Sequence, residues 1–308
     1  DKNNGNSESD GFKRLSLTTR LGWIFTNETS LNFTLRAAGV QSDLDAFGGP
    51  GGDDPNHTSD SRQLQVGTTF KSRAFEELLS YSLSYSLASS VRTVENEPDA
   101  LHPDQSTDYF VGVHSKIESR NEYTLSETQR VNFGAQIQTE MGHSENTFNG
   151  VASDLPEKTA NSKGLYAIHK YESKTFLSEF GLRQDFRDQF SSIVNYNLNA
   201  GYKVPTYESL IYFNYATGFK TPSLVQLYSS YGNQNLNEEK SNSAEFAVEK
   251  SWGSSYFVSV SYFINQYHDL IDFDSVTSKY FNIAKSSSKG LELQSKWGPT
   301  AHFFLKGT

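Results

Sequence analysis

The segment from residue 43 to residue 60 carries the densest group of carboxylates in the chain, and it reads DLDAFGGPGGDDPNHTSD. Calcium takes about six to eight oxygen ligands from carboxylates, carbonyls and water, and a glycine-rich loop lets backbone carbonyls turn toward such an ion. The candidate ligands are Asp43, Asp45, Asp53 and Asp54. The segment therefore predicts a calcium site, and the alternative is an exposed loop that is simply polar and acidic.

Three aromatic residues in long loops are candidates for contacting a ligand, and they are Phe47, Tyr228 and Tyr231. Exposed rings stack on planar molecules, so these side chains could hold an organic ligand. Aromatic residues in such places also form membrane-interface belts or pack the loop itself. Both interpretations stay open at the level of the sequence.

Several classes of function are excluded or disfavoured by composition and by missing motifs. The chain has no Cys, which excludes disulfides and thiolate metal sites, and its seven His are dispersed without zinc spacing. Its 27 Lys and Arg against 36 Asp and Glu argue against a nucleic-acid partner. No serine-hydrolase, zinc-protease, P-loop or dinucleotide motif occurs. We therefore expect a protein that is not an enzyme, although a catalytic group assembled from separate loops would leave no linear motif.

Apolar and polar residues alternate with a period of two along most of the chain, which predicts β-strands. In residues 13–26 the odd positions are mostly apolar and the even positions mostly polar. Residues 80–87, 130–138 and 256–264 alternate in the same way. The pattern predicts an all-β fold of about fourteen strands. They are expected to begin near Phe12, Leu31, Ser61, Leu78, Asp108, Glu127, Lys163, Phe176, Ser192, Glu208, Ser241, Ser255, Lys279 and Thr300.

The connections between these strands alternate between short and long. The long ones are expected at 43–60, 93–107, 143–162, 221–240 and 266–278. A soluble two-sheet sandwich also alternates apolar and polar residues, but it has no reason to gather its long loops at one end. Outer-membrane barrels have short turns at one end and long loops at the other. The loop pattern therefore favours an antiparallel transmembrane β-barrel over a sandwich.

Residues 214–249 read NYATGFKTPSLVQLYSSYGNQNLNEEKSNSAEFAVE and resemble the barrel signature of TonB-dependent outer-membrane receptors. The matching positions are Gly218, Phe219, Lys220, Pro222, Leu227, Tyr228, Gly232, Asn233, Asn235, Leu236, Glu239, Lys240, Ser241 and Glu245. The segments FGLRQD (180–185) and YFNIAKSSSKGLEL (280–293) resemble two further strands of that family. Gln234 and Glu238 depart from it, because proline is common at both positions.

The resemblance implies a 22-stranded barrel closed by an N-terminal plug, with import energised by TonB. Residues 1–308 would then be part of the barrel, about 14 of those strands, while the plug domain and the remaining strands lie outside them. The resemblance also implies outer-membrane lipid and the TonB complex, reached through the plug, as partners. Localisation is accordingly expected in the bacterial outer membrane.

The imported ligand is expected to be scarce and large. The Asp-rich segment resembles extracellular loops of cobalamin receptors, so cobalamin is the first expectation, with calcium ordering the loop against the ligand. A ferric siderophore is the alternative within the same family. A passive porin or adhesin barrel without energy coupling and a barrel enzyme are the rival classes.

Overall fold

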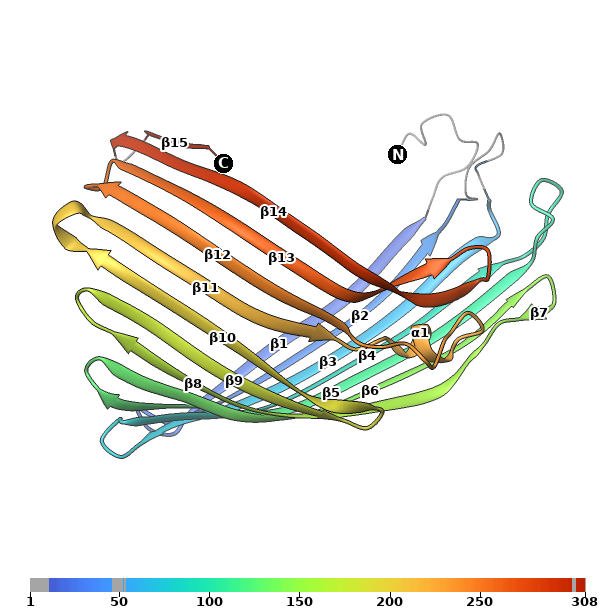
Figure 1. The fold of residues 1–308 in the computed structure, drawn as a ribbon. Helices are drawn as coiled ribbons and strands as arrows, with labels where there is room; N and C mark the ends of the chain where they lie inside the picture. Colours follow the sequence, from blue (N-terminus) through green and yellow to red (C-terminus); the bar gives the residue numbers. More distant parts are fainter. Residues whose placement is uncertain (1–10, 46–51, 53, 301–302, 308) are drawn as a thin grey trace.

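The computed structural model describes residues 11–45, 52, 54–300 and 303–307. These residues form one antiparallel sheet in which each strand pairs with the next along the chain (Figure 1). The first half contains β1 (Phe12–Ile24), β2 (Ser30–Asp43), β3 (His57–Ala74), β4 (Leu79–Asn96), β5 (Ser106–Ser126), β6 (Gln129–Phe148), β7 (Val151–Ala152) and β8 (Leu155–Glu172). The second half contains β9 (Phe176–Arg187), β10 (Phe190–Val204), η1 (Pro205–Tyr207), β11 (Ser209–Lys220), α1 (Leu224–Tyr228), β12 (Glu239–Trp252), β13 (Tyr256–Asp274), β14 (Lys279–Thr300) and β15 (Phe303–Gly307).

Fourteen strands follow one another along the sheet, and the two-residue β7 lies off this path against β6. This confirms the predicted number of strands. Within the described residues, β1 and β15 end the path without pairing with each other. The sheet curls into the open trough that Figure 1 shows, with the strands strongly inclined.

The predicted strand boundaries are wrong mainly at the long-loop end, where strands continue further than the alternation does. β3 begins at His57 rather than Ser61, β8 begins at Leu155 rather than Lys163, and β13 runs on to Asp274. The physical reason is that backbone pairing needs no apolar side chains. Alternation ends where the apolar surroundings end, whereas the hydrogen-bonded ladder continues beyond that level.

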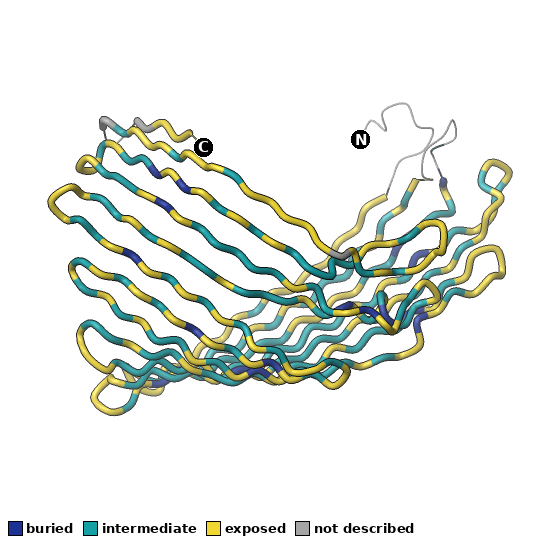
Figure 2. Tube along the Cα trace, viewed as in Figure 1, coloured by how far each residue is buried: buried dark blue, intermediate teal, exposed yellow. Residues whose placement is uncertain are grey.

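The two faces of the sheet differ in chemistry, and only short stretches of the described chain are buried (Figure 2). One face, called here the outer face, exposes large apolar side chains such as Leu17, Phe246 and Leu291. The other, called here the lumen face, carries the polar rows. The buried apolar residues described are Val94, Leu155, Leu227, Leu236 and Ala247. A two-sheet sandwich would bury its apolar rows against a second sheet, so this single layer excludes that alternative.

Helices contribute little to the described residues. None of them is long and apolar enough to span a bilayer. The five-residue α1 lies within the predicted long loop 221–240 and was not expected. Its capping box, formed by Ser223 and Gln226, was readable in the sequence as Ser-x-x-Gln.

Aromatic side chains mark the end of the sheet that carries the short turns. Tyr256 stacks on Trp297 with ring centroids 6.3 Å apart, and Phe176 lies 5.1 Å from Tyr202. Trp252 is exposed beside the same turn as Tyr256. Rings of this kind occupy the membrane–water interface of outer-membrane barrels. They place the short-turn end at one surface of the membrane and the long loops beyond the other.

Gly134 on β6 leaves room for a side chain of the neighbouring strand. It pairs with Tyr166 of β8, and a Cβ built at residue 134 would lie 2.6 Å from the Tyr166 hydroxyl and closer still to the Ser119 carbonyl. The glycine therefore lets the tyrosine lie across the sheet backbone, as aromatic residues do over glycine in strongly curved sheets.

We predict that Gly134→Ala destabilises the barrel by about 1–3 kcal/mol, because the added methyl overpacks this contact. The measurement is the midpoint of urea unfolding of the intact receptor in detergent micelles, followed by intrinsic fluorescence. Gly112→Ala is the matched control, since nothing lies within 4 Å of a Cβ at that strand position. Equal midpoints for the two variants would contradict the prediction.

Candidate functional site

Charged side chains in the middle of the lumen face are paired with one another. Glu118 is buried and contacts Lys116 at 3.0 Å and Arg120 at 2.8 Å. Asp185, also buried, accepts from Arg183, with a shortest distance of 2.7 Å. Pairing of this kind keeps the charges solvated by protein groups rather than free to attract an ion. This part of the wall therefore acts as a polar lining.

The segment 221–238, which contains α1, folds back over the lumen face at the long-loop end (Figure 1). The Ser223 hydroxyl accepts from the backbone N–H of Gln226 at 3.2 Å, and the Gln226 side chain accepts from the Ser223 N–H at 2.8 Å. Leu227 and Leu236 of this segment are buried. A short helix needs such caps and buried anchors, because few residues cannot hold a helix by themselves.

Arg187 fixes the segment to the wall at the β9–β10 turn. Its side chain is 5% exposed and forms an ion pair with Glu238, whose side chain is 11% exposed. Its guanidinium also lies over the rings of Phe219, 4.7 Å from the centroid, and Phe190, at 5.6 Å. Phe219 precedes the segment and Glu238 ends it, so one arginine holds both ends. The family whose signature residues 214–249 resemble commonly has proline at the position of Glu238. In this chain an ion pair with Arg187 fixes that position instead.

The following hairpin supports the middle of the segment. The Lys279 ammonium donates to the backbone carbonyls of Ser230 at 3.0 Å and Gly232 at 3.3 Å. The ring of Tyr231 meets Phe273 edge-on at 5.9 Å, and Phe273 meets Tyr280 at 5.3 Å. These contacts hold residues 230–232 of the segment against β13 and β14.

A cavity of about 780 Å³ lies between this segment and the wall formed by β4, β5 and β6. Its lining includes the charged or titratable side chains of Arg92, His114, Glu140 and His143, together with serine hydroxyls, amide side chains and apolar side chains. The volume lies within the range of about 300–1,000 Å³ that is usual for ligand pockets. The arrangement can hold an organic ligand through a few polar groups.

The three aromatic candidates have different outcomes. Tyr231 lines the cavity and is 49% exposed, which suits a ligand contact. Tyr228 lies under the Lys158 ammonium, 5.0 Å from its ring centroid, so it packs the segment against β8. Phe47 lies outside the described residues. Arg187 and Lys279, which position the segment, had no linear signal because their partners are distant in sequence.

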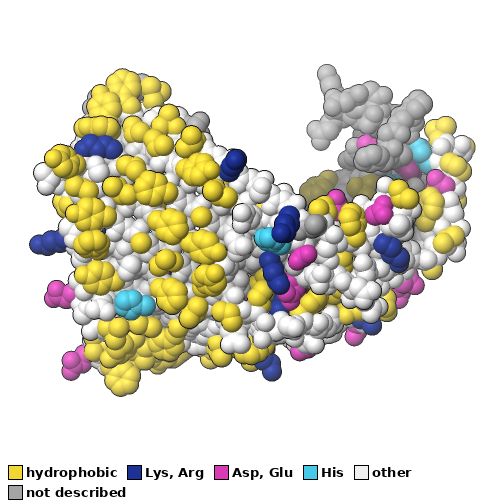
Figure 3. Space-filling view, in the orientation of Figure 1, with side chains coloured by type: hydrophobic (Ala, Val, Ile, Leu, Met, Phe, Trp, Pro, Cys, Tyr) yellow, Lys and Arg dark blue, Asp and Glu magenta, His cyan; other side chains and the backbone are white. Residues whose placement is uncertain are grey.

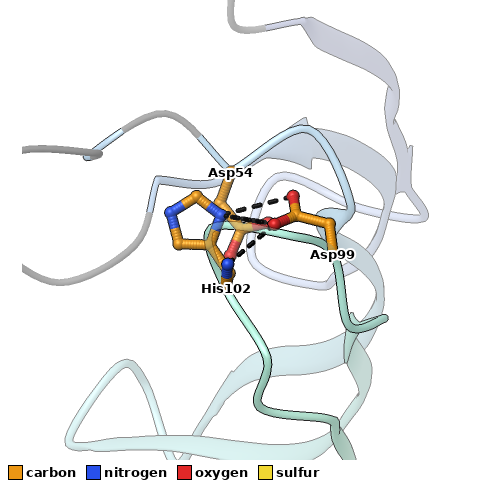
Figure 4. A group of neighbouring side chains, drawn as sticks. All are labelled: Asp54, Asp99 and His102. Carbon is orange, nitrogen blue, oxygen red and sulfur yellow. Dashed lines mark hydrogen bonds and ion pairs between the residues drawn. The ribbon is translucent and has the colours of Figure 1, made fainter.

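Of the four predicted calcium ligands, the three that lie in the described part of the chain have different surroundings. The Asp43 carboxylate accepts the backbone N–H of Gly11 at 2.7 Å, which ties the start of β1 to the end of β2. Asp45 is exposed near the end of β2. Asp53 lies outside the described residues. Asp54 is fully buried and joins two residues from the β4–β5 loop, Asp99 and His102 (Figure 4).

Asp54, Asp99 and His102 could hold a metal ion, since one ligand atom from each lies within 4.8 Å of the others. His102 Nδ1 is 3.3 Å from the Asp99 carboxylate and 3.8 Å from that of Asp54. Asn96 also donates to Asp54, at 3.1 Å. The backbone N–H groups of His102 and Leu101 donate to Asp99 and lower its pKa. The Asp99 carboxylate therefore stays charged below its ordinary titration range.

The whole chain, residues 1–308, matches the family described as "TonB dependent receptor-like, beta-barrel". Among solved structures it is similar to the copper transporter OprC, with a TM-score of 0.75 and 10% identity over 94% of this chain and 51% of that chain. It is also similar to a ferric enterobactin receptor from Pseudomonas aeruginosa, with a TM-score of 0.75 and 15% identity over 99% of this chain and 52% of that chain. A third similar structure is the RagAB peptide importer, with a TM-score of 0.69 and 12% identity over 93% of this chain and 44% of that chain.

At these identities the likeness to solved structures shows the fold. The chain spans about half the length of the structures it matches. Proteins of this family are transporters of the bacterial outer membrane rather than enzymes, which confirms the expected localisation and the expected lack of enzymatic activity. Because the family model covers its full length, the chain belongs to the TonB-dependent receptor β-barrels.

Proposed function

We propose that this chain forms the ligand-facing wall of an active importer that takes up a scarce, metal-bearing ligand. The observation that carries the proposal is the cavity of about 780 Å³ between the barrel wall and the folded-back segment 221–238. A passive pore needs an open lumen, whereas this segment is anchored across the lumen face by Arg187 and Lys279. Energy would come from TonB through a plug domain outside these residues.

Cobalamin and a ferric siderophore are the two ligand classes to be separated. Structures with the same fold carry copper, siderophore and peptide names, so the fold does not choose among cargoes. The preference for cobalamin rests on the Asp-rich loop alone. In that loop the Asp43 carboxylate already accepts the backbone N–H of Gly11, which leaves one carboxylate fewer for calcium than the sequence suggested.

Deletion of the gene is predicted to stop growth on whichever ligand the receptor imports, when that ligand is limiting. The measurement compares the deletion strain, the complemented strain and a strain lacking TonB on limiting cobalamin and on limiting iron supplied as siderophore. If the deletion strain fails to grow on one ligand alone, and the strain lacking TonB fails in the same way, the receptor imports that ligand. Unchanged uptake of both would overturn the proposal.

Arg187→Met is predicted to weaken ligand binding on the order of tenfold or more, because it leaves the buried Glu238 without its partner and frees both ends of the segment. Ligand titration by intrinsic fluorescence and limited proteolysis of residues 221–238 measure the two effects. The double variant Arg187→Met with Glu238→Leu is expected to regain part of the loss, since no unpaired charge remains.

Arg62→Met is the matched control for that experiment. Arg62 pairs with Asp60 at 3.1 Å, but its side chain is 78% exposed. Exposed pairs contribute about 0–1 kcal/mol, so ligand affinity and proteolysis should stay at the level of the unmodified receptor. An equal loss of ligand affinity in the Arg62 and Arg187 variants would show that the buried Arg187–Glu238 ion pair has no special role.

We also propose that the long loops bind a divalent cation, with Asp54 and Asp99 as carboxylate ligands. Calcium remains the ion expected from the sequence. The imidazole of His102 makes a first-row transition ion the second candidate, since calcium prefers oxygen ligands and zinc or copper accept nitrogen.

Calorimetric titration of the intact receptor with Ca²⁺ and with Zn²⁺ tests this. Asp54→Asn combined with Asp99→Asn is expected to abolish the heat of the ion that binds, whereas His102→Gln should weaken only a transition ion. Asp43→Asn is the control, because that carboxylate accepts from Gly11 in β1–β2 pairing. Absence of heat with both ions in the unmodified receptor rejects the site.

A further inference from the structure

The side chain of Asn282 on β14 joins backbone groups from two separate parts of the chain. Its Oδ1 accepts the backbone N–H of Asn237 at 2.8 Å, and its Nδ2 donates to the Asn237 carbonyl at 3.1 Å. The same Nδ2 donates to the carbonyl of Asp269 at 2.6 Å. These bonds use both donor hydrogens and the oxygen of the amide, so they fix its orientation. Asn282 therefore connects the end of the segment 221–238 to β13.

The alternation of β14 puts Asn282 on the lumen face. Leu291 of the outer face lies nine positions further along the strand, and an odd separation places two residues on opposite faces. Figure 3 shows hydrophobic side chains spread over the outer face, with charged side chains beyond them toward the long-loop end. Asn282 is the fourth residue of β14, at that long-loop end. Water is present there to satisfy backbone groups, so loss of the amide should change the position of the chain more than the stability of the barrel.

Asp269, which accepts from Asn282, has a left-handed backbone conformation inside β13, with a φ of 55°. Residues other than glycine avoid this region, and such a conformation persists only where surrounding contacts hold it, often at functional positions. The pairing of β13 with β14 keeps the same register on both sides of Asp269. The departure from strand geometry is therefore confined to the residue whose carbonyl Asn282 binds.

The backbone of Tyr280, two residues before Asn282, holds the same segment. Its N–H donates to the carbonyl of Tyr231 at 3.2 Å, and its carbonyl accepts from Asn233 Nδ2 at 2.9 Å. Tyr231 lines the cavity of about 780 Å³. The start of β14 therefore fixes the segment at a series of points that runs from Tyr231, at the cavity, to Asn237, near the end of the segment.

We propose that Asn282 is a positioning residue for ligand binding. It uses the left-handed Asp269 as a fixed point on β13 and sets the place of residues 231–237, which carry Tyr231 on the cavity wall. It acts through Asn237 and not by contact with the ligand. The inference rests on the proposed function, because it concerns the cavity assigned there to the imported ligand.

The first measurement is hydrogen–deuterium exchange of residues 229–238 in the intact receptor in detergent, without ligand. Asn282→Ala is expected to speed this exchange on the order of tenfold, since each lost hydrogen bond of this kind contributes about 1 kcal/mol. The thermal unfolding midpoint should change little. Asn282→Asp should speed exchange at least as much, because a carboxylate can accept from Asn237 but cannot donate to the two carbonyls.

The second measurement is the affinity for two probes, cobalamin and a ferric catecholate siderophore, followed by intrinsic fluorescence. Asn282→Ala is expected to weaken binding of the probe that the unmodified receptor binds, on the order of tenfold. An unchanged affinity for that probe would overturn the inference while the proposed function stands. If the unmodified receptor binds neither probe, the proposed function fails, and the exchange measurement alone decides whether Asn282 sets the place of the segment.

Asp269→Gly separates positioning from a purely structural role. Glycine adopts a positive φ without the steric cost, so an amide that served only to hold Asp269 in place would no longer be needed in this variant. The double variant Asp269→Gly with Asn282→Ala is expected to keep the fast exchange of Asn282→Ala, because Asn237 still lacks its partner. Exchange restored to the level of Asp269→Gly alone would overturn the proposal.

Asn121→Ala is the matched control. Asn121 also donates to a carbonyl of the neighbouring strand, that of Phe133 at 3.1 Å, but it lies on β5 toward the short-turn end. Its loss should leave both the exchange of residues 229–238 and the probe affinity unchanged. Equal effects of the Asn121 and Asn282 variants, or unchanged exchange in Asn282→Ala, would also overturn the proposal.

Discussion

The requirement that every backbone N–H and C=O be paired within the hydrocarbon of a membrane controls this structure. A strand in lipid has no water to satisfy its polar groups, so each strand must pair on both sides. Consecutive antiparallel pairing meets the requirement with short connections and gives the strand order seen from β1 to β15. The ladder, rather than a buried apolar core, holds the wall together.

This constraint reverses the usual roles of the two faces. The apolar rows face outward, where lipid covers them, and the polar rows line the lumen. Charges on the lumen face are tolerated because they pair, as Glu118 does with Lys116 and Arg120. Some side-chain contacts each close a specific gap in the wall. The ion pair of Arg187 with Glu238 and the packing of the Tyr166 ring over Gly134 are two examples.

The long-loop end combines two separate tasks on one rigid wall. The segment 221–238 shapes a cavity on the lumen face, and the Asp54 group joins two loops. The sheet register fixes the distances among these features. A shift of one residue in any strand would exchange its outer and lumen side chains, so function and register are inseparable here.

The sequence by itself determined the strands, their number, the two kinds of end and the family, because alternation, turn spacing and the 214–249 signature are local properties. Tertiary structure decided the site. Asp54 joins Asp99 and His102 rather than Asp43, and Arg187 finds Glu238, because register brings together residues that lie 45 or more positions apart. The ends of β3, β8 and β13 were also decided there, since backbone pairing continues where the apolar pattern stops.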